Sequence, residues 1–97
     1  MRIIAHSTLA DFYLQHADSK IPLENWYHIA KKSEWNGLQD IKQQFNSVDY
    51  VGNQRYVFNI KGNDYRLVVK ALFIQKIIYI RFVGTHEEYD KIDCSTI

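Results

Sequence analysis

Apolar residues in the first part of the chain recur at helical spacing. Residues 2–5 come before this pattern, and their two adjacent isoleucines predict a short first strand. The stripe that follows has intervals of three and four residues, and it consists of Leu9, Phe12, Tyr13 and His16. It predicts a helix with one face buried in the core, and we expect Ser7 or Thr8 to cap its start.

The same spacing predicts two more helices in the first half of the chain. The second helix is expected to have Pro22 in its first turn, where proline is well tolerated. Its apolar stripe consists of Leu23, Trp26, Tyr27 and Ala30. Gly37 is expected to end this helical region, because glycine is common just after a helix C-terminus. A short third helix follows, marked by Leu38, Ile41 and Phe45.

The pattern changes in the second half to runs of β-branched and aromatic residues. Strands are predicted over 56–60, 65–69 and 77–83, with a shorter run over 48–51 leading in. Gly62-Asn63 suits a two-residue hairpin turn, and Thr85 is expected to cap a last short helix. This order predicts one α+β domain over residues 1–97. An N-terminal strand and two to three helices pack on one face of an antiparallel sheet, and a short helix lies near the C-terminus.

The hairpin turn decides which residues lie opposite each other on its two strands. The expected pairs are Lys61 with Asp64, Ile60 with Tyr65, Asn59 with Arg66, Phe58 with Leu67, Val57 with Val68, Tyr56 with Val69 and Arg55 with Lys70. Faces alternate along a strand, so one face is apolar and should lie under the helices, and the other is a charged face. In the last strand the residues placed in the core are Ile78, Ile80 and Phe82. The residues left for the charged face are Ile77, Tyr79, Arg81 and Val83.

Charge is unevenly distributed along the 97 residues, although the formal net charge is only +1. Residues 51–84 contain one acidic residue, Asp64, and the basic residues Arg55, Lys61, Arg66, Lys70, Lys76 and Arg81. A local basic surface of this kind can bind phosphate groups even when the total charge is close to zero. The alternative is that the charged face serves solubility and protects the sheet edge.

The remaining composition narrows the class of protein. With 14% aromatic residues, 4 Gly and 1 Pro, the chain has the composition of a folded domain. The single cysteine, Cys94, cannot form an internal disulfide and is expected to be an incidental thiol. No signal peptide and no stretch of about 20 apolar residues is visible, so we expect a cytoplasmic protein that does not enter a membrane.

Other groups of reactive side chains form weaker patterns. His86, Glu87 and Asp90 lie close together in the sequence, but no second His or Cys stands at a metal-ligand spacing. No glycine-rich phosphate loop and no serine nucleophile motif occurs. We therefore expect neither a metal nor a cofactor. The charged face instead has residue types that suit RNA, because Arg grips phosphates, Lys and His transfer protons and Tyr stacks on bases.

Two stretches of the sequence resemble the HigB toxin family. The first covers residues 55–68, and the second covers residues 78–92, where the phrase Gly-Thr-His-x-Glu-Tyr-Asp-Lys-Ile is the most specific part. The resemblance extends over essentially the whole chain and includes the pair Trp26-Tyr27 and Phe45. It implies a RelE-like fold and an endoribonuclease that cuts mRNA, often on the translating ribosome.

The resemblance also implies which residues act on RNA. The residues expected to be catalytic are Lys61, Arg66, Arg81, His86, Tyr89 and Lys91, and those expected to bind RNA are Arg55, Asn59, Lys70, Tyr79 and Asp90. Arg66 and Arg81 are expected to stabilise the charge of one scissile phosphate together. His86, or else Lys61 or Lys91, would transfer protons without a metal. Tyr89 would orient or stack a nucleotide, and His86 has the alternative of serving only the cap of the last helix.

The same resemblance implies the partners of the chain. A HigA-type antitoxin with a helix-turn-helix domain would neutralise it, and contact with operator DNA would run only through that antitoxin. Two other functions use the same surface. The chain would then be a non-catalytic RNA- or ribosome-binding module, or a co-repressor partner of the antitoxin.

Overall fold

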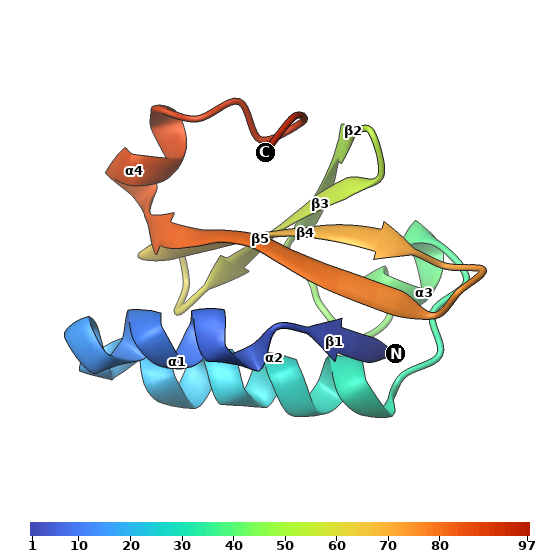
Figure 1. Ribbon diagram of the computed structural model, residues 1–97, viewed down its shortest axis with the longest axis horizontal. Helices are drawn as coiled ribbons and strands as arrows, with labels where there is room; N and C mark the ends of the chain where they lie inside the picture. The colour runs from blue at the N-terminus through green and yellow to red at the C-terminus, as the bar shows by residue number, and fades with distance from the viewer.

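The computed structural model describes residues 1–97, which form a five-stranded sheet with helices on both sides (Figure 1). The strands are β1 (Arg2–Ile4), β2 (Val48–Gly52), β3 (Arg55–Ile60), β4 (Tyr65–Leu72) and β5 (Ile77–Thr85). The helices are α1 (His6–Gln15), α2 (Lys20–Lys32), α3 (Leu38–Lys42) and α4 (His86–Asp90), with a 3₁₀ turn, η1, over Ala17–Ser19. The predicted α+β class, with its short C-terminal helix, is confirmed.

The strand order is β1-β5-β4-β3-β2, and every neighbouring pair is antiparallel except one. Strand β1 runs parallel to β5, with Arg2 opposite Ile77. The sheet, which the sequence predicts to be antiparallel, is therefore mixed, because its edge pair of β1 and β5 is parallel. A parallel pair needs a long crossover, and here the chain between β1 and β5 includes the helices and the other three strands.

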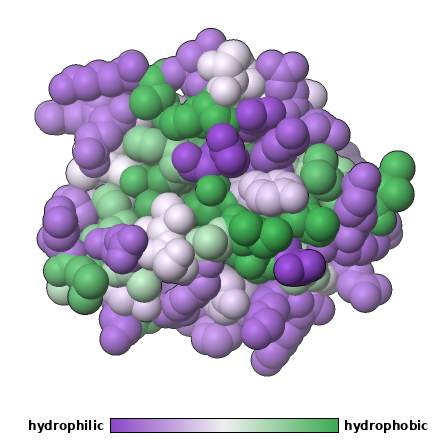
Figure 2. All heavy atoms as spheres, in the orientation of Figure 1, coloured by the Kyte–Doolittle hydropathy of each residue, from purple (hydrophilic) through white to green (hydrophobic).

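Helices α1 and α2 lie side by side against one face of the sheet, and the main core fills the space between the two layers (Figure 1). Its fully buried residues include Leu9, Leu23, Trp26, Phe58, Leu67 and Ile78. The ring centroids of Trp26 and Trp35 lie 5.4 and 6.4 Å from that of Phe58, and both tryptophans belong to the core. In the side view of Figure 2, hydrophobic residues gather in the middle, and hydrophilic residues dominate above and below.

The hairpin of β3 and β4 has the predicted register. Six residue pairs are observed, from Ile60 opposite Tyr65 at the turn to Arg55 opposite Lys70 at the far end. The turn itself covers residues 61–64, and Lys61 and Gly62 have φ angles of +52° and +64°. Lys61 therefore belongs to the turn rather than to the strand. The alternation of side chains that places Asn59 and Arg55 on the charged face does not extend to Lys61.

A β-bulge in β5 changes the alternation that the sequence predicts. Val69 pairs with Ile80 and Val68 pairs with Phe82, so Arg81 has no partner on β4. Beyond the bulge, Phe82 lies on the charged face, and Val83 packs against the core. The expected positions of Phe82 in the core and Val83 on the charged face are therefore wrong.

Gly84 lies directly against the ring of Phe82. An ideal Cβ at Gly84 would lie 2.5 Å from Cζ of that ring, so any larger residue would require the ring to move. The Phe82 ring therefore covers the backbone at Gly84, which is buried and lies directly opposite Arg66.

The helix ends that the sequence predicts are observed in the C-terminal half of the chain but not in the N-terminal half. Thr85 caps α4 in a capping box, because its side chain accepts from the Glu88 amide and the Glu88 carboxylate accepts from the Thr85 amide at 2.8 Å. Helix α1 begins at His6 after Ala5 and has no side-chain cap, so Ser7 and Thr8 lie inside the helix. Gly37 lies immediately before α3, not at the end of α2.

The segment after α4 folds back over the sheet on the side opposite α1 and α2 (Figure 1). Asn53 Nδ2 donates to the main-chain oxygen of Ser95 at 2.9 Å. Val57 and Val68 are 4% and 0% exposed although they lie on this side, outside the main core cluster. The charged face is therefore partly covered. No helix combines the length and the apolar character that a bilayer crossing requires.

We predict that Ile78→Ala lowers the free energy of unfolding by about 3 kcal/mol, because it leaves a cavity in a fully buried site. Ile74→Ala is the matched control, since Ile74 is 94% exposed, and it should change the value by less than about 0.5 kcal/mol. Urea denaturation measures both. Equal effects of the two substitutions would contradict the described core.

Candidate functional site

The charged face carries three rows of residues that run across β3, β4 and β5. The Arg66 row is Asn59, Arg66 and Gly84, the apolar row is Val57, Val68 and Phe82, and the Arg55 row is Arg55, Lys70 and Tyr79. Lys70 lies four positions after Arg66 on β4, so at about 3.3 Å per residue the backbones of the two polar rows lie roughly 13 Å apart. They form two distinct positions on one face, with an apolar strip between them.

Arg66 contacts the last helix from the sheet. Its guanidinium carbon lies 5.8 Å from the centre of the Tyr89 ring, which is a cation–π contact. Its Nη1 donates to the main-chain oxygen of Asn63 at 3.1 Å. No carboxylate forms an ion pair with Arg66, so its positive charge is available to an anion. Beside it, the Asn59 amide nitrogen donates to the Ser47 hydroxyl.

Tyr89 is held in a partly desolvated position. Burial raises the pKa of Tyr89 to about 12, and the Cys94 thiol, whose sulfur lies 3.4 Å from the Tyr89 hydroxyl, acts in the same direction. The phenol therefore stays protonated near neutral pH. It can stack on a base or donate a hydrogen bond, but it is not suited to take up a proton as a base.

The first and last residues of α4 present an acid–base pair to solvent. His86 Nδ1 lies 3.2 Å from the Asp90 carboxylate, one helical turn away, and both side chains are more than half exposed. The carboxylate orients the ring and leaves Nε2 free to exchange a proton. Lys91 follows directly and is exposed. No three side chains of His, Cys, Asp or Glu gather in a geometry that could hold a metal ion.

The Arg55 row forms a second basic position at the other end of the face. Together with Leu72 and Arg81, its residues line an open cavity of about 300 Å³. The main-chain oxygen of Ile97 accepts hydrogen bonds from Arg55 Nε at 3.2 Å and Arg55 Nη2 at 2.8 Å. It also accepts one from Arg81 Nε at 3.3 Å. Two guanidinium groups thus converge on one oxygen atom.

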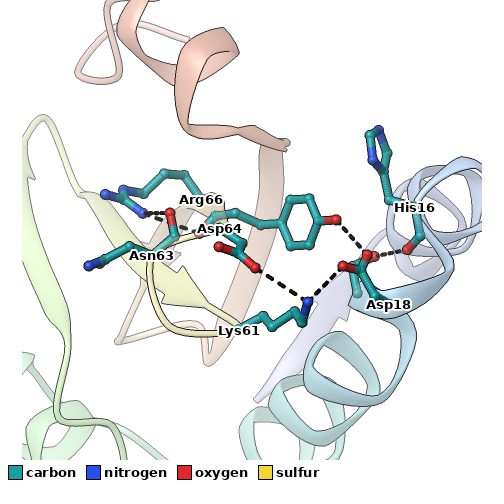
Figure 3. Close-up of polar contacts among 8 residues, drawn as sticks. His16, Asp18, Lys61, Asn63, Asp64 and Arg66 are labelled. Carbon is teal, nitrogen blue, oxygen red and sulfur yellow. Dashed lines mark hydrogen bonds and ion pairs between the residues drawn. The ribbon is translucent and has the colours of Figure 1, made fainter.

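Lys61 points away from the charged face (Figure 3). Its ammonium lies 2.8 Å from the Asp18 carboxylate of η1 and 3.3 Å from Asp64. The hydrogen bonds from Lys61 and then from the Tyr65 hydroxyl hold the pKa of Asp18 below its ordinary value. Asp18 and Asp64 in turn raise the pKa of Lys61. An ammonium that is shared between two carboxylates is a poor proton donor. The ion pair of Lys61 with Asp18 also connects the hairpin to the helical layer.

The structure brings some of the expected site residues together and separates others. Arg66, Tyr89 and Asn59 lie at one end of the charged face, near α4 with its His86, Asp90 and Lys91. Arg55, Lys70, Tyr79 and Arg81 lie at the other end. Arg66 is opposite Gly84, three residues from Arg81, and the two guanidinium groups have different partners. Arg81 lines the cavity beside the Arg55 row, and the joint action of Arg66 and Arg81 on one phosphate stays a prediction.

Three groups that shape the candidate site were not predicted from the sequence. Asp18 gave no signal because its partner Lys61 is 43 residues away in the chain. Phe82 was placed in the core, since a bulge leaves no mark in the pattern of apolar residues. The main-chain oxygen of Ile97 belongs to no side chain, so no motif could have indicated it.

Comparison with known proteins identifies relatives over most of the chain. A family described as HigB toxin, the RelE-like toxic component of a toxin–antitoxin system, matches residues 19–92. The mRNA interferase toxin HigB of Escherichia coli K12 is 34% identical over 96 residues, which are 93% of this chain and 88% of the relative. The mRNA interferase HigB of Escherichia coli O6:H1 is 22% identical over 94 residues, which are 95% of this chain and 91% of the relative. The family match includes α4 and strands β2 to β5, and hence all three rows of the charged face.

Lys61→Gln is predicted to raise the pKa of Asp18 towards its ordinary value of about 3.9, because the ammonium is the main cause of the lowering. The folded-state pKa is the lower one, so the stability from this pair is present above about pH 4 and is lost as the pH falls through the folded-state pKa. A ¹³C NMR titration of the carboxyl group measures the pKa. The exposed Lys32 on α2 supplies the control, Lys32→Gln, which should leave it unchanged. An unaltered titration of Asp18 in Lys61→Gln would show that the two groups are not paired.

Proposed function

This chain belongs to the HigB family of RelE-like toxins, and from this premise we propose that it is an endoribonuclease that cleaves mRNA. The proposal extends to this chain the activity for which its relatives are named. The observation that carries it is the contact between Arg66 and Tyr89 on a basic sheet face that points away from the main core. The single domain would act in the cytoplasm, where mRNA is translated.

The reaction that suits these side chains is attack by an RNA 2′-hydroxyl on the neighbouring phosphorus. The 2′-oxygen bonds to phosphorus as it loses its proton, and the bond between phosphorus and the 5′-oxygen of the next nucleotide breaks. That 5′-oxygen takes up a proton. The products are a 2′,3′-cyclic phosphate and a 5′-hydroxyl. Two proton transfers and one build-up of negative charge are therefore the tasks that the protein must perform.

The residues near α4 match these tasks in chemical type. The unpaired guanidinium of Arg66 would stabilise the charge on the phosphoryl oxygens. His86, oriented by Asp90, would exchange the proton at Nε2, with Lys91 as the second proton-transfer group. Tyr89, protonated because of its raised pKa, would donate a hydrogen bond or stack on a base. Lys61 is the weakest candidate of the set, since two carboxylates already hold it.

We propose partners of the kind that a toxin–antitoxin family implies. A HigA-type antitoxin would bind and neutralise the chain, and operator DNA would be contacted only through that antitoxin. The substrate mRNA would be cut on the ribosome. Co-purification with the product of the neighbouring reading frame tests the antitoxin, and cleavage of free and ribosome-bound mRNA tests the ribosome.

Arg66→Ala is predicted to reduce mRNA cleavage by about 100–1000-fold, the usual effect of losing one transition-state donor. Expression of the isolated chain should arrest growth, and this substitution should relieve the arrest. Primer extension on cellular mRNA counts the new 5′ ends. Lys32→Gln, on the helical layer, should keep full activity. If Arg66→Ala stays fully toxic, the proposed site is wrong. If the wild type binds RNA and creates no new 5′ ends, the chain is a non-catalytic binding module.

Chelation of divalent metals is predicted to leave the cleavage rate unchanged, because protein side chains would perform both proton transfers and the charge stabilisation. The rate is measured on a free RNA substrate with purified protein, in EDTA and in Mg²⁺. A loss of cleavage in EDTA that Mg²⁺ restores would contradict the 2′-hydroxyl mechanism proposed above.

A further inference from the structure

Asp18 connects η1, the turn between α1 and α2, to the β3–β4 hairpin (Figure 3). One oxygen of its carboxylate, Oδ2, lies 2.8 Å from the Lys61 ammonium. The other oxygen, Oδ1, accepts a hydrogen bond from the Tyr65 hydroxyl. Lys61 begins the hairpin turn and Tyr65 directly follows it. A single carboxylate therefore holds the hairpin turn at both of its ends.

The backbone of this turn has an unusual conformation. Lys61 and Gly62 have φ angles of +52° and +64°, a region that a lysine rarely adopts. Inside the turn, the Asp64 amide donates to the main-chain oxygen of Lys61 at 3.2 Å. Asp18 is the only residue outside the turn that forms an ion pair with Lys61. The position of the turn relative to the helices thus depends on Asp18.

The same segment of the chain directs the guanidinium group of Arg66. Arg66 Nη1 donates to the main-chain oxygen of Asn63 at 3.1 Å and to that of Tyr65 at 3.4 Å. These are the only hydrogen bonds that the Arg66 side chain forms within the protein. Both acceptors lie between the two points that Asp18 holds, or at one of them. A displacement of the turn would therefore also displace the acceptors that orient the guanidinium.

Tyr65 also connects this segment to α4. It directly precedes Arg66 on β4, and it lies opposite Thr85, the residue that caps α4. The ring of Tyr89 on that helix makes the cation–π contact with Arg66. Both partners of this contact are therefore positioned by residues next to Tyr65.

We propose that Asp18 is a positioning residue of the candidate nuclease site, which fixes the direction of the Arg66 guanidinium by holding the hairpin turn. It acts through Lys61 and Tyr65 and does not itself touch RNA. The Lys61 and Asp18 side chains are 43% and 49% exposed, and ion pairs of this kind contribute little to folding stability. The effect of Asp18 is therefore on geometry. The inference rests on the proposed function in that Arg66 stabilises the transition state.

The kinetic test measures cleavage of a free RNA substrate by the purified full chain. Asp18→Ala should lower kcat by about 10–100-fold and change KM by less than about twofold, because a misdirected guanidinium loses its interaction with the transition state. Asp40→Ala is the matched control. The Asp40 carboxylate also accepts a hydrogen bond on the helical side, from the Asn36 amide at 2.8 Å, and its loss should leave kcat unchanged. A wild-type kcat in Asp18→Ala overturns the inference.

A double variant separates positioning from general damage to the fold. If Asp18 acts through Arg66, its removal has no further effect once the guanidinium is absent. Asp18→Ala combined with Arg66→Ala should therefore cleave RNA within about twofold of the rate of Arg66→Ala alone. Losses that multiply in the double variant overturn the inference. Circular dichroism melts establish that each variant is folded, and Asp18→Asn, which keeps the side-chain volume, takes the place of an unfolded Asp18→Ala.

A measurement without RNA separates this inference from the nuclease proposal. The order parameter of the Arg66 Nε–H bond, obtained from ¹⁵N relaxation, should fall in Asp18→Ala and keep its wild-type value in Asp40→Ala. An unchanged order parameter in Asp18→Ala overturns the inference, even when the cleavage rate is reduced. A wild-type protein that leaves RNA intact overturns the nuclease proposal, whereas a lowered order parameter still supports the role of Asp18 in orienting Arg66.

Discussion

The alternation of side chains along β3 and β4 is the constraint on which the rest of the molecule depends. One set is apolar and includes Phe58 and Leu67, so α1 and α2 cover it. The other set keeps Arg55, Arg66 and Lys70 in contact with solvent. A slip of one residue would bury these cations without partners, at a cost on the order of several kcal/mol each. The same constraint that builds the core therefore also creates the basic surface.

The bulge in β5 divides that surface into two parts. An unbroken β5 would place Phe82 in the core and leave Arg81 in the regular alternation; the extra residue instead moves the aromatic ring between two basic positions. One position lies next to α4 with its exposed His86–Asp90 pair, and the other lies beside the cavity of the Arg55 row. The charged face thus has two separate basic positions on one small sheet.

The hairpin register could be predicted because it depends on neighbours in the sequence. Gly62-Asn63 marks the turn, and the polarity of residues on either side agrees with only one pairing. The Thr85 cap was predictable for the same reason, since its partner is Glu88. Three features were not: the bulge at Arg81, the tie from Lys61 to Asp18 and the fold-back of the last residues. Each depends on contacts across space that leave no periodic trace in the chain.

The parallel pair of β1 and β5 orders events during synthesis. Arg2 pairs with Ile77, so the first strand to leave the ribosome waits until most of the chain has been translated before it finds its neighbour. Until then the nascent protein lacks the complete five-stranded sheet and the complete core. It also lacks Tyr79, Arg81 and α4. A chain whose proposed target is messenger RNA would therefore acquire its basic surface only after the codons for β5 and α4 in its own message have been read.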